Sequence, residues 1–189
     1  MAFNPDEFRA EMQYDGARPN KFQVDLTLPS SGIANLAGGA TNVSRKFSFM
    51  CRTSQIPDRN IGTTIANYFG REVKLAGDTT YSEWMCTVYN DEDFVVRNAL
   101  EKWMNAMNQN RSNLRVPQAV NSSLYTADPI LSQYGKTGDV IKRYKLVGGF
   151  PINLSIIDLD WGTNDVVEEF TVTFQYQYWI DPDNTDIST

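Results

Sequence analysis

The side chains that could carry out chemistry in this sequence are mostly carboxylates. Asp158 and Asp160 alternate in the stretch NLSIIDLDW, and on a strand this spacing points both side chains to the same side, where they could contact a divalent cation. Such a site needs further oxygen ligands, so we interpret the pair as solvated. Residues 181–186, DPDNTD, begin like a calcium-binding loop but lack its glycine and its distal glutamate. The sequence therefore predicts no metal site.

The sequence also offers little support for a phosphate-binding site or for nucleophilic catalysis. The stretch YGKTG at 134–138 is similar to the end of a phosphate-binding loop, but that loop requires glycine where this chain has Ile130, so we interpret it as a turn before a strand. The chain contains no histidine, which is the commonest general base and transition-metal ligand. We expect its two cysteines, Cys51 and Cys86, to be reduced and mostly buried. These observations predict a protein that is not an enzyme and uses no cofactor.

Charge, hydropathy and length narrow the possible partners and the domain organisation. The formal net charge of -6 argues against tight nucleic-acid binding, which depends on Lys and Arg. No apolar stretch approaches the length that crosses a bilayer, so we expect no membrane insertion. With 189 residues and 41% hydrophobic content, the chain can bury one sizeable core. We expect a single domain over residues 1–180 and a polar C-terminal tail over residues 181–189.

The first predicted element that could position a functional site is the stretch EEFTVTFQYQYW at 168–179. Its apolar and polar residues alternate, which predicts a strand with one dry face and one wet face. The residues expected to face the core are Phe170, Val172, Phe174, Tyr176 and Tyr178. The residues expected to face water are Glu169, Thr171, Thr173, Gln175 and Gln177.

The rest of the chain shows mainly the same period of two, which predicts short antiparallel strands. We expect strands at 22–28, 47–52, 84–89, 139–148 and 150–161, and an extended segment at 57–75 that a turn at 76–78 closes. A helix is expected from Asn90 as N-cap to about Met107, with an apolar stripe made of Val96, Leu100, Trp103, Met104 and Met107. Residues 32–42 and 108–139 are expected to form surface loops. This pattern is typical of a mainly β fold, an antiparallel sandwich or partly closed barrel with one flanking helix.

Several stretches follow one another along the chain: GARPNKFQVDL, FSFMCRTSQIP, AGDTTYSEWMCTVYNDED and YKLVGGFPINLSIIDLDW, continuing to FTVTFQYQYW. In this order they resemble the tail tube proteins of contractile-tailed bacteriophages. The similarity covers the chain from about Ala17 to Trp179. The run from Ser31 to Thr41 is longer than is usual in the family, and the polar tail beyond Trp179 also departs from its pattern.

The resemblance implies that copies of the chain close into hexameric rings and that the rings stack into a tube. One sheet of each subunit then belongs to a continuous barrel around the lumen, which places the polar face of residues 169–177 on the lumen wall. The apolar side chains of the extended segment would join one ring to the next, and we name for this role Ile56, Ile61, Ile65, Tyr68 and Phe69. The alternative is that these side chains fold back onto their own core.

The function implied is structural: an inner tail tube in the virion, assembled in the host cytoplasm, through which DNA passes during ejection. The implied partners are further copies of the chain and the tail sheath, tape-measure, baseplate and tail terminator proteins, with DNA present only transiently in the lumen. A second possibility is the tube of a phage-derived contractile injection device that carries protein cargo. A third, an enzyme or a carbohydrate-binding sandwich, is disfavoured by the lack of catalytic motifs.

Overall fold

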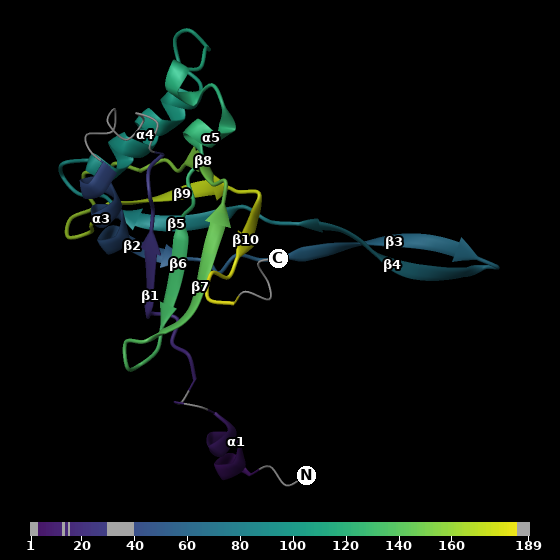
Figure 1. Cartoon of the computed structure of the whole chain (residues 1–189). Coiled ribbons are helices and arrows are strands. Elements are labelled where there is room, and N and C mark those ends of the chain that lie inside the picture. Colours follow the sequence, from purple (N-terminus) through teal and green to yellow (C-terminus); the bar gives the residue numbers. More distant parts are fainter. Residues whose placement is uncertain (1–3, 13, 15, 30–39, 185–189) are drawn as a thin grey trace.

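Two four-stranded antiparallel sheets form the body of the molecule in the computed structural model (Figure 1). The structure describes residues 4–12, 14, 16–29 and 40–184. The first sheet, sheet A, has the strand order β1-β6-β7-β10, and its strands are Phe22–Asp25, Ile130–Tyr134, Val140–Val147 and Tyr178–Ile180. The second, sheet B, has the order β2-β5-β9-β8, with strands Cys51–Ser54, Trp84–Tyr89, Glu169–Gln175 and Phe150–Leu154. Strands of one sheet run across those of the other in Figure 1.

Helices cover one end of the sheets, and a long hairpin leaves the body. The two principal helices are α3, Ala40–Met50, and α4, Val95–Met107. Three short elements complete the helical part: α1, Pro5–Glu11, the 3-10 turn η2, Pro117–Ala119, and α5, Ser122–Tyr125. Within the part of the chain that the structure describes, strands β3, Asn60–Tyr68, and β4, Arg71–Thr80, pair only with each other, and they extend far from the body (Figure 1).

The core lies between the inner faces of the two sheets and helices α3 and α4. Its largest fully buried side chains include Trp84 from β5, Trp103 from α4 and Phe174 from β9. The ring of Phe174 lies 5.5 Å from that of Trp84 and 6.3 Å from that of Trp103. Each tryptophan donates its indole N–H to a backbone carbonyl, of Gln55 and Tyr125 respectively, so the core buries these polar groups with partners.

Much of the predicted architecture is confirmed. Strand β5 alternates as expected, because Trp84, Cys86 and Val88 are buried while their neighbours lie at the other face. Helix α4 ends at Met107, and Val96, Leu100 and Trp103 of its apolar stripe are buried. Cys86 is buried and Cys51 is partly buried, both without a disulfide, and burial raises the pKa of the Cys86 thiol well above its usual value. The fold is an antiparallel β-sandwich flanked by helices.

The strand expected at 47–52 is wrong, because residues 40–50 form helix α3 and only Cys51 begins a strand. Phe47 is fully buried whereas Phe49 is 76% exposed, although alternation on a strand would place them on the same face. Val43, Phe47 and Met50 are spaced four and three residues apart, and this helical period competes with the period of two. Most of the loop expected at 32–42 lies outside the described residues, and its last three positions belong to α3.

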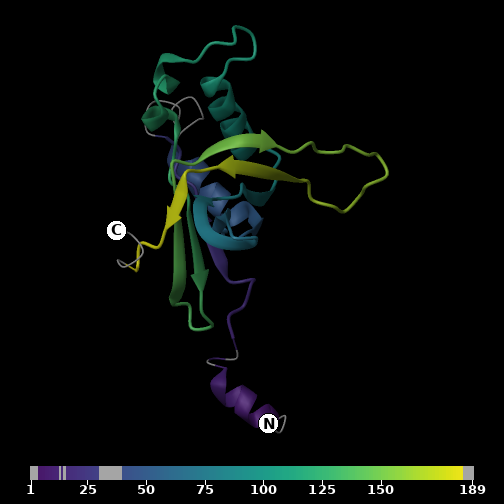
Figure 2. The same ribbon diagram turned by 90° about the vertical axis from the view of Figure 1, so that its right-hand side faces the viewer.

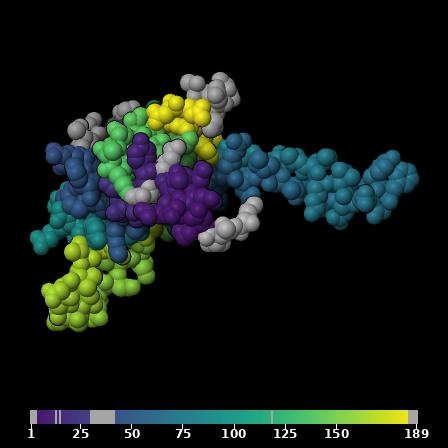
Figure 3. Space-filling view, turned by 90° about the horizontal axis from the view of Figure 1, so that it is seen from below, coloured from purple at the N-terminus to yellow at the C-terminus, as the bar shows by residue number. Residues whose placement is uncertain are grey.

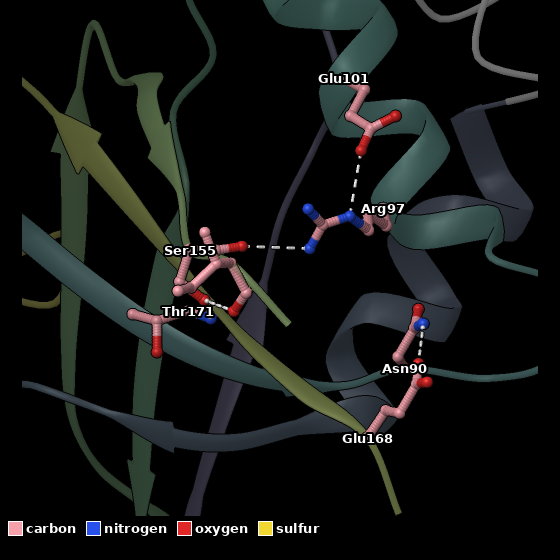
Figure 4. Close-up of polar contacts among 7 residues, drawn as sticks. Asn90, Arg97, Glu101, Ser155, Glu168 and Thr171 are labelled. Atoms are coloured by element: carbon pink, nitrogen blue, oxygen red, sulfur yellow. Dashed lines mark hydrogen bonds and ion pairs between the residues drawn. The ribbon is translucent and has the colours of Figure 1, made fainter. Parts of the chain in front are cut away.

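Other predicted boundaries are also corrected. Asn90 is not an N-cap: α4 begins at Val95, and the buried Asn90 side chain donates to Glu168 Oε2 over 2.9 Å (Figure 4). Residues 76–78 lie inside β4 and form no turn, since the hairpin turns at residues 69 and 70. The long loop expected at 108–139 contains η2, α5 and the central strand β6. The strand expected at 150–161 ends at Leu154.

The last predicted strand is split between the two sheets. Strand β9 ends at Gln175 in sheet B, and β10 begins at Tyr178 in sheet A, where it pairs with β7. Tyr176 is buried as expected, but Tyr178 is 46% exposed and not part of the core. The alternation of apolar and polar residues therefore continues from β9 into β10, and the sequence pattern does not show that the chain changes sheet there.

The first residues after β10 are fastened to strand β7. The Asp181 carboxylate is almost fully buried, forms an ion pair with Lys142 and accepts a hydrogen bond of 3.1 Å from the backbone N–H of Asp183. Asp183 in turn forms an ion pair of 3.0 Å with Arg143. The hydrogen bond from Lys142 lowers the pKa of Asp181 below its ordinary value.

We expect Asp181→Asn to lower the free energy of unfolding by about 1 to 3 kcal/mol at neutral pH, because a charged hydrogen bond in a buried place is lost. A carboxylate whose pKa is depressed on folding stabilises the protein above its ordinary pKa, and this contribution is lost as the pH falls through the folded value. Thermal unfolding at pH 7 and in acid should therefore show a difference between the two proteins that shrinks in acid. Asp183→Asn, at an exposed pair, is the control with the smaller effect. A difference that stays constant with pH would contradict this assignment.

Within the described residues, no helix is long and apolar enough to span a membrane.

Candidate assembly surfaces

The outer face of sheet B is the first candidate surface, because it is mostly polar and most of its described side chains are partly or fully exposed. Thr87 and Thr171 lie opposite each other on β5 and β9, and their hydroxyl groups are 3.1 Å apart. Arg52 of β2 forms an ion pair with Glu169 of β9 and lies 5.8 Å above the ring of Tyr89. The hydrogen bond to Glu169 raises the pKa of Arg52. Opposite charges on this face are thus paired within the subunit.

The five residues predicted for the lumen wall do not all lie on this face. Strand β9 carries Glu169, Thr171, Thr173 and Gln175 on the side opposite to Phe170, Val172 and Phe174. Thr173 is only 6% exposed. Gln177 is exposed but lies beyond β9, where its backbone N–H donates to the Val147 carbonyl of sheet A over 3.0 Å. The structure therefore brings four of the five together on sheet B.

Sheet B ends in two outer strands, β2 on one side and β8 on the other. Among the described residues each pairs with a neighbour on one side only, since β2 pairs with β5 and β8 pairs with β9. Unpaired backbone groups at the edge of a sheet are a template for another strand. The two edges are different in sequence and position, so they suit a head-to-tail contact between copies, and such contacts form a ring when the rotation between copies closes.

The β3–β4 hairpin is the second candidate surface. Almost every residue on both of its strands is exposed, although six large apolar side chains lie on them or at the tip. The exposed apolar side chains of the hairpin are Ile61, Ile65, Tyr68, Phe69, Val73 and Leu75. An exposed apolar surface of this kind marks a site of association.

The tip of the hairpin is a tight turn with a prominent aromatic pair. Phe69 and Gly70 both have positive φ angles, of 45° and 77°, as the two central residues of a two-residue hairpin turn of type I′ require. Phe69 is 92% exposed, and its ring meets that of Tyr68 edge-on with centroids 4.6 Å apart. The five side chains predicted to join rings are all more than half exposed, so none of them folds back onto the core.

The base of the hairpin is held by hydrogen bonds that fix its direction. The Asp58 carboxylate accepts from the Ser82 backbone N–H over 2.9 Å and from the Ser82 hydroxyl over 2.6 Å. These bonds lower the pKa of Asp58. The backbone carbonyl of Asp58 accepts from Trp179 Nε1 over 2.8 Å, which connects the hairpin to strand β10. No sequence pattern indicates this clamp, since its members lie far apart in the chain.

A comparison with protein families decides what these surfaces belong to. The family model described as phage tail tube protein matches residues 17–181. The chain belongs to the phage tail tube protein family. Its place is accordingly in the tail of a virion.

Curated relatives of this tail tube protein support the same assignment. The tail tube protein gp19 of Enterobacteria phage T4 is 26% identical over 178 residues, which are 94% of this chain and 99% of the relative. The tail tube protein of Serratia phage KSP90 is 25% identical over 173 residues, 90% of this chain and 93% of the relative.

Solved structures of low identity share the fold of this tail tube protein. The tube-terminating cap of the anti-feeding prophage has a TM-score of 0.62 at 17% identity, covering 96% of this chain and 98% of that chain. A chain of the sheath–tube complex of an extracellular contractile injection system has a TM-score of 0.57 at 13% identity, and the match covers 95% of this chain and 98% of that chain.

Proposed function

We propose that six copies of this chain close into a ring through the edges of sheet B and that the rings stack into the inner tube of a contractile phage tail. The observation that carries the proposal is sheet B itself, which has one face on the core, a second face that is mostly polar, and on each side an outer strand that pairs with one neighbour among the described residues. Joining β8 of one copy to β2 of the next makes one continuous barrel. Sheet A and the helices then lie outside it.

In this arrangement the outer face of sheet B lines a water-filled lumen. Glu169, Thr171 and Gln175 face DNA that passes through it, and Arg52 is neutralised by Glu169. A wall that offers few unpaired basic groups does not hold phosphates, so DNA can slide. The remaining lumen candidate on the strand, Thr173, contributes little surface because it is covered.

The projecting hairpin and the segment before it are assigned to contacts between successive rings, which would bury the exposed side chains of Ile56, Ile61, Ile65, Tyr68 and Phe69. The tube is a passive structural element without catalysis. Its partners are the tail sheath, which surrounds it, the tape-measure protein in its lumen, and the baseplate and tail terminator proteins at its ends. The alternative is the tube of a contractile injection device with protein cargo, which the likeness in fold to an injection-system tube complex keeps open.

The direct test is electron microscopy of the purified protein, alone and after addition to purified tail initiation complexes. We expect hollow rods in the second sample at the least, because a first ring can require a template. A protein that stays monomeric at high concentration and does not extend the complexes would overturn the proposal.

The lumen assignment predicts a defect in ejection for Gln175→Lys. The change leaves the fold intact because the side chain lies opposite Phe174, but it adds a positive charge per subunit to the wall, which attracts passing phosphates. Tails should assemble and eject DNA more slowly, and added salt should relieve the defect. Ejection kinetics at two ionic strengths are the measurement. Asn98→Lys, which adds the same charge on the exposed side of α4, is the control that should eject normally. Normal ejection by Gln175→Lys tails would show that this face is not the lumen wall.

A further inference from the structure

The segment between β8 and β9, residues 155–168, is an acidic loop with an exposed apolar surface. Its sequence SIIDLDWGTNDVVE contains four acidic residues and no basic one. Trp161 is completely exposed, and Ile156 and Leu159 are each more than 80% exposed. In Figures 2 and 3 the loop projects from the body in a direction different from that of the hairpin. A tryptophan in this position is not explained by the fold of the single chain.

The ends of the acidic loop are fastened to the body, which holds the loop in this projecting position. Arg97 of α4, which also binds Glu101 over 3.0 Å, donates to the Ser155 carbonyl over 3.3 Å. The Ser155 hydroxyl accepts from the Thr171 backbone N–H over 2.9 Å (Figure 4). At the other end, Glu168 accepts from the Asn90 side chain. The loop is thus presented by α4 and β9, and little further ordering is needed for it to bind a partner.

Strand directions in sheet B identify what lies next to the loop in a closed ring. All neighbours in the order β2-β5-β9-β8 are antiparallel, so a barrel that continues this alternation places β2 of the next copy antiparallel to β8. The last residue of β8, Leu154, then lies near Cys51, the first residue of the neighbouring β2. The acidic loop starts at this point and meets the junction of α3 and β2 on the next copy.

A groove of about 610 Å³ opens at that junction, between β1, α3 and β2. Its lining includes Phe22, Arg45, Phe49 and Arg52, and the Phe49 ring is 76% exposed with the Arg45 guanidinium 5.8 Å above it. Asp25 is the acidic residue in the lining, and it accepts hydrogen bonds from Gln23 and Ser48. The segment Ala40–Ser54 that forms one wall contains three basic residues and no acidic one. Lys46 and Arg52 form ion pairs within the subunit, and Arg45 lies over the exposed Phe49 ring.

We propose that the acidic loop of one copy docks into this groove of the next copy in the ring. Trp161 packs against Phe49, and the loop carboxylates face Arg45. The inference rests on the proposed ring and adds to it a second contact beyond the paired sheet edges. It explains together the exposed indole, the exposed Phe49 ring and the opposite charges of Arg45 and the loop carboxylates.

Cysteine cross-linking in assembled tubes tests the contact directly. In a Cys51→Ser background that keeps Phe49 and Trp161, Ser44→Cys in the groove combined with Thr163→Cys in the loop should give, on mild oxidation or with a short bismaleimide, a ladder of covalent multimers that ends at the ring size. Each single variant, treated in the same way, should give no ladder. Tubes that form normally but yield no ladder with either reagent would overturn the proposal while leaving the tube function in place.

Assembly measurements provide a second, independent test. We expect Trp161→Ala to leave the thermal unfolding of the free subunit unchanged, since the side chain is fully exposed, and to raise the protein concentration required for tube growth about tenfold or more.

Arg45→Glu should impair growth, and adding Asp158→Arg should restore it, because the swap recreates the charge pair in the opposite sense. If Trp161→Ala tubes grow normally but no longer bind sheath, the loop serves the sheath and the proposal is wrong. If the unchanged protein forms no tube on any template, the ring itself is wrong.

Discussion

Phe174→Asp should abolish folding. The Phe174 side chain is completely buried, and its ring lies between those of Trp84 and Trp103, so the aspartate would have neither water nor a positive partner. Loss of the ring from the core costs about 3 to 5 kcal/mol, and burial of an unpaired carboxylate adds several more. This sum is comparable to the whole stability of a typical domain, about 5 to 15 kcal/mol.

Circular dichroism and thermal unfolding of the purified variant measure this effect, and Gln175→Asp is its matched control. Gln175 is the next residue on β9 and faces away from the core, so the same carboxylate there should leave the melting transition nearly unchanged. A cooperative transition for Phe174→Asp near the wild-type temperature would contradict the placement of this strand face in the core.

Phe69→Asp should stop tube growth and leave the subunit folded. The side chain is 92% exposed at the tip of the hairpin, so its loss removes no core contact, and aspartate tolerates the left-handed φ that this turn requires. In the proposed contact between rings, however, the charge would be buried without a partner, at a cost of several kcal/mol in every subunit of the ring. The repeated interface cannot tolerate a penalty of this size.

Microscopy of growth on tail initiation complexes, together with circular dichroism of the free subunit, separates the two effects. Phe69→Asn is the matched control, because asparagine suits the same backbone conformation without adding a charge. It should weaken growth less than the aspartate does. Tubes of normal length from Phe69→Asp subunits would exclude the hairpin tip from the contact between rings.

The sequence predicted those parts of the fold where one period dominates. Strand β5 and the buried side of β9 are recognisable because large apolar residues alternate with polar ones, and α4 because its stripe repeats over 13 residues. Helix α3 is not predicted by the sequence pattern because Phe47, Phe49 and Cys51 alternate with other residues as on a strand. The competing helical spacing of Val43 and Phe47 is hard to recognise because it begins next to a run of small residues. Tertiary packing favours the helix over a strand here, because Phe47 packs into the core and Phe49 does not.

The candidate surfaces were predicted less completely, for a related reason. The polar side of residues 169–175 follows from alternation, but Gln177 and Tyr178 lie beyond a change of sheet that depends on pairing with Val147, a contact distant in sequence. The apolar residues at 56–69 stand out in the sequence, and Val73 and Leu75 fall in the same predicted extended segment, but only the paired hairpin places these two on the opposite strand. Ile156, Leu159 and Trp161 fall within the strand predicted at 150–161, and they are exposed because strand β8 ends at Leu154.

The hairpin leaves sheet B at one end of its strands only, where Ser54 and Trp84 lie, and the Asp58–Ser82 clamp holds it in that direction. The proposed stack of such subunits has a direction, because one of its ends displays aromatic tips and the other displays the surfaces proposed to receive them. Its two ends therefore expose different side chains. A subunit added at one end offers its hairpin, whereas a subunit added at the other offers its receiving surface, so the two ends need not grow at the same rate. The same asymmetry means that the proteins which start and close the tube must each recognise a different surface of the same chain.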